Sequence, residues 1–492
     1  MAESLSAFQL ILTPQTLLLV LLGTFLGITV GAIPGLTGAM LIALTLPLTF
    51  GMDASHALVL MVSMYVGSVS GGLITATLLR MPGTPASIMT TLDGFPMAQS
   101  GRPGRALGLS ISASFVGGMI SWVFLFLLAK PVANLSTKLG PFDYFSLVLM
   151  ALVLIASVGG KSLSLGLLSG LLGILASMPG MSPATGELRM TMGIVDLNDG
   201  FKLLPVLIGL FALSQLIKDL YVEDEVESVE MSREGMFMSL RDWKTQAVNL
   251  LRSSVIGTWI GILPGVGANI GSVMAYTAAK NVSDKPEEFG KGSEHGIVAA
   301  EAANNATVGG ALIPLVAMGI PGSVIDAILL GAFVIHGLQP GPLLFDQNPD
   351  IVYTIIGTML VANIVMFGLM YVSVGVLAKL RLIPKKFLLP VILTFCIIGS
   401  YALSNRMFDV WVMAMFGIVG FGMERLKIPL APFVIGFVLA PVAEENLCAG
   451  LMATNGDYSP IVTRPFSLAF CILAAILFFK PMIKFKKNAP AS

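Results

Sequence analysis

Long apolar segments recur along the chain from about residue 15 to residue 480, separated by short polar stretches. A helix needs about 20 apolar residues to cross a hydrocarbon core of roughly 30 Å. The pattern therefore predicts an all-α polytopic membrane protein with about 12 transmembrane helices and shorter re-entrant pieces. The first apolar run, residues 17–30, follows a stretch without Lys or Arg, so a retained helix is expected rather than a cleaved signal peptide.

Two polar stretches interrupt the apolar pattern, at residues 218–246 and 281–294. Both carry charges of both signs, which are costly inside a bilayer, so both are expected to lie in water. The C-terminal tail is basic and is predicted to face the cytoplasm, because positive side chains collect on that side of a membrane. Its lysines are Lys480, Lys484, Lys486 and Lys487. Charge does not decide the side of the N-terminus.

Composition supports this class and excludes others. Of 492 residues, 55% are hydrophobic and only 11% are charged, against roughly a quarter in soluble domains. The net charge is zero, so no nucleic-acid partner is expected. The three cysteines and three histidines lack metal-ligand spacing, and no phosphate-binding loop or Ser-His constellation is present. Neither a metal, an organic cofactor nor an enzyme activity is predicted.

Internal repetition is the most informative feature of the sequence. Landmarks of the first half recur in the second half in the same order, as in transporters built from duplicated halves. They are Gly27, Gly31, Pro34 and Gly35 with Gly257, Gly261, Pro264 and Gly265; Gly71-Gly72 with Gly309-Gly310; and Pro82-Gly83-Thr84 with Pro321-Gly322-Ser323. The predicted parts are repeat 1 at about 18–215, a charged loop at 218–247, repeat 2 at about 248–440, and a C-terminal membrane segment with its basic tail at 441–492.

Glycines spaced four apart predict flat helix faces on which a second helix packs closely. The Pro-Gly pair ending each stripe predicts a helix break, since proline removes a backbone donor and glycine permits unusual dihedral angles. Such a break is tolerated in a membrane only where it is buried in protein or lines a cavity. A polar turn and a new apolar run follow each break, which predicts a half-helix whose free N–H groups suit a carboxylate. The candidate substrate ligands here are Pro34, Gly35, Thr37, Gly38, Gly265, Gly267 and Asn269.

Hydroxyl residues adjoin the second pair of breaks, at Pro82-Gly83 and Pro321-Gly322. These hydroxyls could bind a carboxylate or a sodium ion, or they could merely satisfy the carbonyls that a kink frees. They belong to Thr84, Ser87 and Ser323. Arg80, just before the first of these breaks, could pair with a substrate carboxylate or extend to the lipid headgroups.

Two acidic residues lie near apolar segments, where a carboxylate costs at least about 2.5 kcal/mol to insert. Glu301 lies within about one helical turn of Asn304 and Asn305, an arrangement that suits ion coordination or hydrogen-bonded helix packing. Asp326 could bind a coupling ion or cap the half-helix that follows Pro321-Gly322. These four residues are the candidate ion-coupling groups.

Three segments resemble the large membrane subunit of the tripartite tricarboxylate transporter family, TctA type: GGLITATLLRMPGTPASIMTTLDGFPMAQSGRPGRALG, EAANNATVGGALIPLVAMGIPGS and LLGAFVIHGLQPGPLLF. The resemblance spans roughly residues 18–440. It implies a permease of the bacterial inner membrane that works with a small four-helix membrane subunit and a periplasmic solute-binding protein. It also implies that a sodium or proton gradient drives uptake of di- and tricarboxylates such as citrate. The matching motifs place the pathway at Pro34, Gly35, Pro82, Gly83, Thr84, Asn304, Asn305, Pro321, Gly322 and Ser323.

The sequence departs from the family pattern at two positions beside the Pro-Gly motifs. Arg80 stands where a small or amide residue is usual, and Asp326 stands where a small or hydroxyl residue is usual. The two could tune substrate choice, or pair with one another if the halves face each other. Two other functions stay open: a passive organic-anion channel, which would not accumulate solute, and a non-transporting membrane scaffold, which paired broken helices disfavour.

Overall fold

Helices make up 77% of the computed structural model of the chain. The structure describes residues 9–33, 35–158, 163–220, 229–378, 385–402 and 404–487. Among them the only β-structure is a short antiparallel hairpin in which Gly180 lies opposite Arg189. The predicted all-α membrane class is confirmed.

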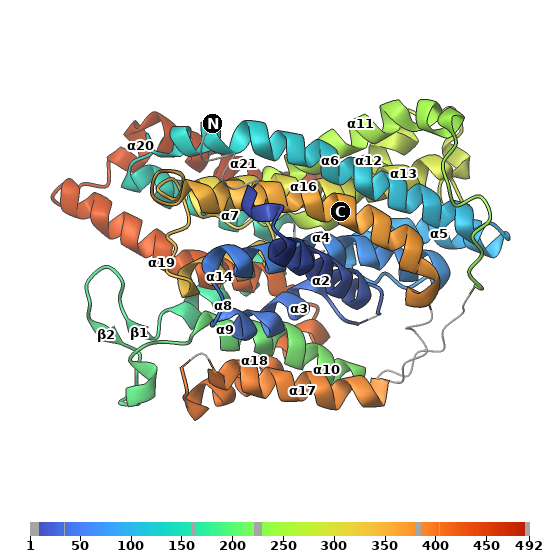
Figure 1. The fold of residues 1–492 in the computed structure, drawn as a ribbon. Coiled ribbons are helices and arrows are strands. Elements are labelled where there is room, and N and C mark those ends of the chain that lie inside the picture. The colour runs from blue at the N-terminus through green and yellow to red at the C-terminus, as the bar shows by residue number, and fades with distance from the viewer. Residues whose placement is uncertain are drawn as a thin grey trace. The chain divides into compact units, whose positions relative to one another are not determined.

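The elements follow one another with short connections (Figure 1). Before the hairpin they are α2 (Pro14–Gly31), α3 (Gly38–Thr45), η1 (Leu46–Thr49), α4 (Ala54–Leu78), η2 (Pro85–Ser87), α5 (Ile88–Gln99), α6 (Pro103–Ser136), α7 (Pro141–Val158) and α8 (Leu163–Ser177). The hairpin and the next elements are β1 (Gly180–Met181), β2 (Leu188–Arg189), η3 (Val195–Leu197), α9 (Leu203–Leu207), η4 (Ile208–Leu213) and α10 (Ser214–Asp219). Then come α11 (Leu240–Ile262), α12 (Gly267–Asn281), η5 (Pro286–Glu288), α13 (Glu294–Met318), α14 (Val324–Ile335), α15 (Leu344–Gln347) and α16 (Pro349–Leu377). The last are α17 (Lys385–Ala402), α18 (Met407–Arg425), α19 (Leu430–Ala453), α20 (Pro460–Thr463) and α21 (Pro465–Lys487).

Six helices of the described residues are long and apolar enough to cross a membrane: α2, α4, α6, α16, α18 and α19. Shorter apolar helical segments are Gly38–Thr49, Pro141–Ile155, Leu163–Ser177, Val324–Ile335, Leu389–Ala402 and Pro465–Phe479. The 12 residues of α14 rise only about 18 Å, too little to cross a bilayer alone. The chain is thus a multi-pass membrane protein, while the number of about 12 spans stays a prediction.

The chain forms two compact units, each assembled from both halves of the sequence. Unit 1 comprises Met1–Ala133, Gln215–Leu263 and Gly267–Gly399, and unit 2 comprises Asn134–Ser214, Pro264–Val266 and Ser400–Ser492. Neither half of the sequence therefore folds as a unit of its own. The existence of two repeats stays a prediction.

Close helix pairs dominate unit 1, where α2 packs along α4 and α11 packs along α13 (Figure 1). A Cβ built on Gly27 would collide with the Met64 carbonyl oxygen, and one on Gly261 would lie 2.5 Å from the Thr307 carbonyl oxygen. The predicted glycine stripes are therefore confirmed as faces on which a second helix backbone packs.

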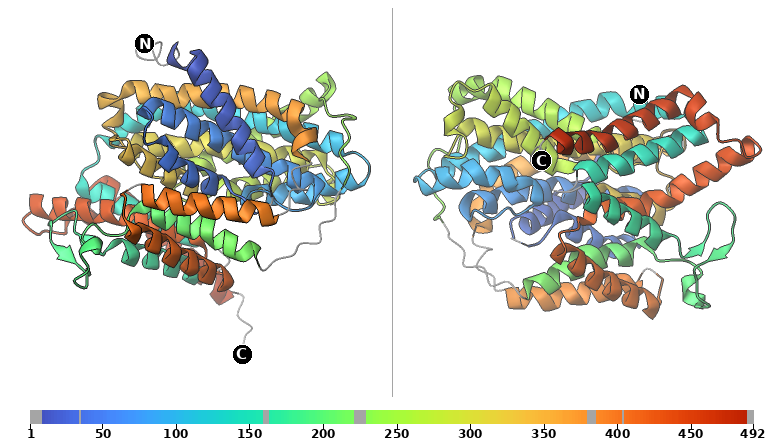
Figure 2. Two further views of the ribbon diagram at one scale, coloured as in Figure 1. Left: turned by 60° about the horizontal axis from the view of Figure 1, so that its bottom comes forward. Right: turned by 180° about the vertical axis from the view of Figure 1, so that it is seen from behind.

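In unit 2, α7 packs against α8, α19 and α21, and α18 packs on α9 and η4 (Figure 2). Arg189 of the hairpin donates two hydrogen bonds to Glu444 of α19, both 2.6 Å long. The Ser182 hydroxyl donates to the same carboxylate at 2.7 Å. Charge-assisted bonds of this kind fasten the hairpin to α19.

An ion triad joins the starts of α6, α11 and α13 in unit 1. Arg105 donates to both oxygens of Asp242, at 2.8 and 2.7 Å, and to both oxygens of Glu294, at 3.0 and 2.7 Å. Both acids lie in the first turn of a helix, where negative charge is favoured. The Arg105 guanidinium holds the pKa of the Asp242 carboxyl well below its usual value.

Replacing Arg105 with alanine is expected to lower the free energy of unfolding by about 2 kcal/mol, because two partly buried carboxylates then lack their cation. The depressed pKa of Asp242 means that this contribution is present above the unfolded carboxyl pKa, about 3.9, and is lost as pH falls through the folded value. Thermal midpoints of purified protein at neutral and acid pH measure both effects.

The matched control is Lys285→Ala, because Lys285 forms an exposed pair with Glu288 at 3.0 Å. That pair is worth less than about 1 kcal/mol. Equal shifts in the two variants at neutral pH would contradict a stabilising role for the triad.

The predicted segment boundaries differ from those of the helices. α11 begins at Leu240 because Ser239 and Asp242 form a capping box, so the end of the predicted loop at 218–247 is helical. Residues 221–228 of that loop lie outside the described residues. The boundary expected between residues 440 and 441 falls inside α19. The side chains of the four tail lysines also lie outside the described part of the chain.

Candidate functional site

Two short apolar helices of unit 1, α3 and α14, begin with a hydroxyl residue as N-cap. Thr37 Oγ1 accepts a hydrogen bond from the Met40 backbone N–H at 3.2 Å. Ser323 Oγ accepts one from the Asp326 backbone N–H at 3.3 Å. Each cap satisfies one of the four N–H groups that lack an intrahelical partner at a helix start. The rest carry partial positive charge, which suits an anion.

These two helix starts lie beside each other, since α14 packs against both α3 and α4. A Cβ built on Gly38, the first residue of α3, would lie 3.2 Å from Ile325 Cδ1. The Tyr65 hydroxyl of α4 lies 3.1 Å from Ser323 Oγ. Thr37 and Ser323 are partly exposed, whereas Tyr65 is buried. Both caps are therefore reachable from solvent on one side and backed by protein on the other.

Asp326 lies fully buried in the first turn of α14. Neither of its carboxylate oxygens has a hydrogen-bond partner among the described residues. Tyr65 and Ser323 provide the neighbouring hydroxyls. The alternative in which Asp326 caps α14 is wrong, because the Ser323 hydroxyl occupies that role.

The second pair of helix starts consists of η2, which leads into α5, and α12, which packs against η2. The Thr84 N–H donates to Ser87 Oγ at 3.2 Å, and the Ser87 hydroxyl donates to the Thr84 carbonyl at 2.8 Å. These bonds to the local backbone are those of the alternative in which hydroxyls satisfy a kink. α12 begins at Gly267, and Asn269 in its first turn is exposed.

The Pro-Gly breaks depend on glycine in two ways. Gly35 and Gly265 have φ angles of +92° and +70°, which a side chain would strain, as predicted. Gly83 and Gly322 instead allow close approach. A Cβ on Gly83 would collide with the Gly31 carbonyl oxygen, and one on Gly322 would lie 2.9 Å from the carbonyl oxygen of Gly261. Pro34 lies outside the described residues, and Pro321 is buried.

Glu301 lies fully buried in α13 and is the centre of a polar cluster. Its carboxylate accepts the Thr90 hydroxyl at 2.5 Å and the Ser114 hydroxyl at 3.0 Å. Asn305 donates to the Glu301 carbonyl at 3.2 Å and accepts the Ser70 hydroxyl at 2.6 Å. The cluster therefore links α4, α5, α6 and α13.

Asn304 lies beside this cluster and is also fully buried. Its amide nitrogen makes a long, 3.5 Å bond to the Val69 carbonyl, and its Oδ1 has no partner among the described residues. Glu301, Asn304 and Asn305 thus gather as the spacing predicts. No hydrogen bond or ion pair among the described residues joins them to Asp326.

Arg80 lies apart from both clusters. It is exposed, has a φ of +55°, and places its guanidinium 5.9 Å from the ring centroid of Phe95. Pro82 is exposed as well. Asp326 is fully buried and accepts no bond from a described residue, so the predicted pair between Arg80 and Asp326 is wrong. An exposed guanidinium keeps its hydration, which a buried partner would remove.

Comparison with known families decides the class of the protein. The family model described as "Tripartite tricarboxylate transporter TctA family" matches residues 17–435. The chain belongs to the TctA family. TctA is a family of transporters, not of enzymes, and its members form part of a tripartite system.

This TctA protein is similar to two proteins of Agrobacterium vitis. It is 32% identical over 487 residues to "Uncharacterized 52.8 kDa protein in TAR-I ttuC' 3'region", a match that covers 98% of this chain and 96% of the relative. It is 35% identical over 235 residues to "Uncharacterized protein in TAR-II ttuC' 3'region", covering 47% of this chain and 97% of that relative. No solved structure matches the chain significantly.

Sequence reasoning missed a buried carboxylate in this TctA protein. Asp93 Oδ1 accepts the backbone N–H groups of Gly290, Gly292 and Ser293 at 2.8, 2.9 and 2.8 Å, and Oδ2 accepts the Tyr276 hydroxyl at 2.8 Å. The available signal was an acid inside the short apolar helix that follows a Pro-Gly break. The hydroxyl partners in both clusters carry no such local signal; they are Tyr65, Ser70, Thr90 and Ser114.

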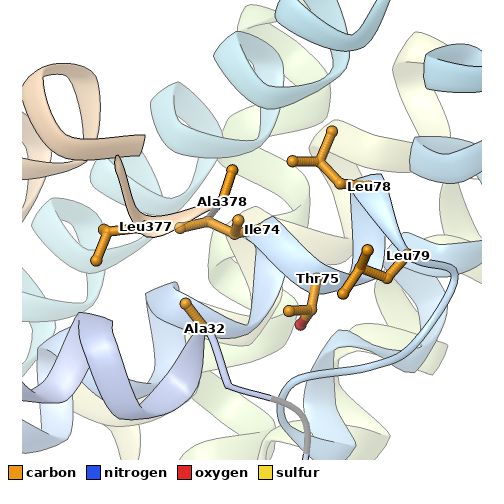
Figure 3. A pocket seen from close by; sticks show the side chains of 7 residues that line it. All are labelled: Ala32, Ile74, Thr75, Leu78, Leu79, Leu377 and Ala378. Atoms are coloured by element: carbon orange, nitrogen blue, oxygen red, sulfur yellow. The ribbon is translucent and has the colours of Figure 1, made fainter. Parts of the chain in front are cut away.

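A small hollow in unit 1 of the TctA chain lies away from these clusters (Figure 3). Its lining residues are Ala32, Ile74, Thr75, Leu78, Leu79, Leu377 and Ala378. Only Thr75 among them has a polar side chain, so this hollow does not suit a carboxylate. Within the described ranges, no group of three or more His, Cys, Asp or Glu side chains could hold a metal ion.

Proposed function

We propose that this chain is the large permease subunit of a secondary transporter that imports small di- and tricarboxylates across the bacterial inner membrane. An ion gradient drives uptake, and a periplasmic solute-binding protein and a small four-helix membrane subunit complete the system. Membership of the TctA family supports the transport class and the tripartite arrangement. An alternative is a passive organic-anion channel or a non-transporting scaffold.

The observation that carries the carboxylate assignment is the pair of helix starts at α3 and α14. Both offer backbone N–H groups and a partly exposed hydroxyl, on Thr37 and Ser323, and the two helices pack against each other. Two adjacent helix starts can bind two carboxylate groups of one substrate without a basic side chain. This explains how a membrane segment with so few charges would select an anion.

The committed contacts divide into two tasks in this proposal. Substrate is bound by the Pro-Gly breaks and the residues that follow them: Pro34, Gly35, Thr37, Gly38, Arg80, Pro82, Gly83, Thr84, Ser87, Gly265, Gly267, Asn269, Pro321, Gly322 and Ser323. The coupling ion, sodium or a proton, is bound by Glu301, Asn304, Asn305 and Asp326. Alternating access then exposes the helix starts first to one side of the membrane and then to the other.

The test is uptake of labelled citrate and a panel of dicarboxylates into vesicles that contain the protein with both partners. We expect accumulation above the external concentration when a sodium or proton gradient is imposed, and no accumulation when the binding protein or the gradient is omitted. Vesicles prepared without the large subunit are the control.

Two outcomes would contradict the proposal. Equilibration of the solutes without accumulation, independent of the binding protein, would favour the passive channel. Correctly folded complexes that move none of these carboxylates under any gradient would contradict the assigned substrate class.

A further inference from the structure

Asp326 differs from every other fully buried carboxylate of the described chain in having neither oxygen bonded. The others each accept at least one hydrogen bond: Asp93, Asp143, Glu301 and Asp409. Both oxygens of Asp326 lack a partner among the described residues. An ionised carboxylate without partners is very costly in a low-dielectric interior, so the group must be neutralised there.

No basic side chain faces Asp326 from the helices packed against α14, which are α3, α4 and α13. α3 carries no titratable residue. The titratable side chains of the other elements are His56 and Tyr65 on α4, Glu294, His295 and Glu301 on α13, and His336 at the C-cap of α14. Only Tyr65 lies at the start of α14, through its contact with Ser323.

The remaining groups of that list are engaged elsewhere. His56 lies 3.6 Å from Asp53 at the opposite end of α4, and His336 contacts Thr49 at 3.1 Å. Glu294 pairs with Arg105 at the start of α13. The neutralising charge must therefore come from solution.

The surroundings suit a proton better than a metal cation. A hard cation needs a shell of several oxygen ligands, whereas Asp326 has two neighbouring side-chain oxygens, on Tyr65 and Ser323. Backbone N–H groups, not carbonyls, point outward at the start of α14, and their partial positive charge opposes a metal ion. A proton needs no shell, because it forms one O–H bond.

A route for the proton is also present. Ser323 is partly exposed, while Asp326 one helical turn further on is fully buried. The Ser323 hydroxyl contacts Tyr65 and accepts the Asp326 backbone N–H. A hydroxyl can accept a proton bond from water and donate one onward, so Ser323 connects the accessible surface with the buried carboxylate.

We propose that Asp326 is the group that carries the coupling proton of this transporter, with Ser323 as its connection to water. One O–H bond forms on the carboxylate when hydronium on one side of the membrane gives up its proton, and that bond breaks when water on the other side takes it. The role in coupling rests on the proposed transport function, whereas proton binding by Asp326 does not.

Proton binding is tested by infrared difference spectroscopy of the full-length protein in lipid, titrated between acid and alkaline pH. We expect a carboxylic-acid C=O band, shifted in D₂O, in wild type and in Asp346→Asn, whose exposed carboxylate is the matched control. Asp326→Asn and Asp326→Ser should both lack that band, and either that folds suffices. A band of unchanged intensity in these variants would overturn the proposal.

Coupling is tested in vesicles with both partners under an imposed proton gradient. Wild type and Asp346→Asn should accumulate carboxylate, while Asp326→Asn should still exchange it across the membrane at an accumulation ratio of about one, because uncoupled carriers only equilibrate. Accumulation by Asp326→Asn at the wild-type ratio, or by wild type on a sodium gradient alone, would overturn coupling through Asp326. If wild type moves no carboxylate under any gradient, the proposed function fails, and the infrared experiment still decides the proton site.

Discussion

Gly261→Ala is expected to destabilise the protein by about 2 kcal/mol or more, although it adds a single methyl group. The new Cβ would lie 2.5 Å from the Thr307 carbonyl oxygen and 3.0 Å from Gly310 Cα. Both neighbours are backbone atoms of α13, so they cannot rotate away as a side chain would. The two helices would have to separate, which forfeits the dispersion contacts along their whole interface. Thermal midpoints from size-exclusion chromatography of heated, detergent-solubilised protein measure this loss.

Gly368→Ala is the matched control, because a Cβ on that glycine of α16 meets nothing within 4 Å. It should be neutral or stabilise by up to about 1 kcal/mol, since alanine favours a helix over glycine. Gly31→Ala, whose Cβ would collide with the Ser68 carbonyl oxygen on α4, should behave like Gly261→Ala. Equal midpoints for Gly261→Ala and Gly368→Ala would show that the α11–α13 contact tolerates widening.

Asp93→Ala is expected to open the connection between α12 and α13 and to cost several kcal/mol. It would leave the N–H groups of Gly290, Gly292 and Ser293 and the Tyr276 hydroxyl without an acceptor. Each buried donor left unpaired costs about 1–3 kcal/mol. Limited trypsin digestion measures the opening through the rate of cleavage after the exposed Lys291, which should rise strongly.

Two further variants separate the lost acceptor from the lost charge. Asp93→Asn keeps one oxygen in place and should give an intermediate cleavage rate. Asp284→Ala removes an exposed carboxylate from the same connection and should leave the rate unchanged. A wild-type cleavage rate in Asp93→Ala would mean that the turn holds its shape without this carboxylate.

Much of the local structure could be predicted from the sequence. The run at residues 17–30 forms α2, because apolar length and a Thr-Pro start suffice for a helix in lipid. The breaks and new helix starts at Gly35, Thr37 and Gly265 follow from residues that change backbone conformation locally. Glycine spacing predicted close packing, though it did not say which helix each stripe would meet.

Side-chain partners could not be predicted in the same way. Arg80 and Asp326 both adjoin a Pro-Gly break, yet one is exposed beside Phe95 and the other is buried without a partner. Glu301 is satisfied by hydroxyls from α5 and α6, which lie some two hundred residues away along the chain. Burial and partners of this kind depend on which helices meet.

The sequence by itself therefore determined the solvent of this protein, the places where helices begin and break, and the flat faces that helices share. These properties are local, because each depends on a residue and its near neighbours in the chain. Only the tertiary structure decided that α3 and α14 begin side by side, that each compact unit draws on both halves of the sequence, and that Asp326 is a buried carboxylate without a partner. These depend on contacts between distant segments, whose free energies belong to pairs of helices and cannot be read from either helix alone.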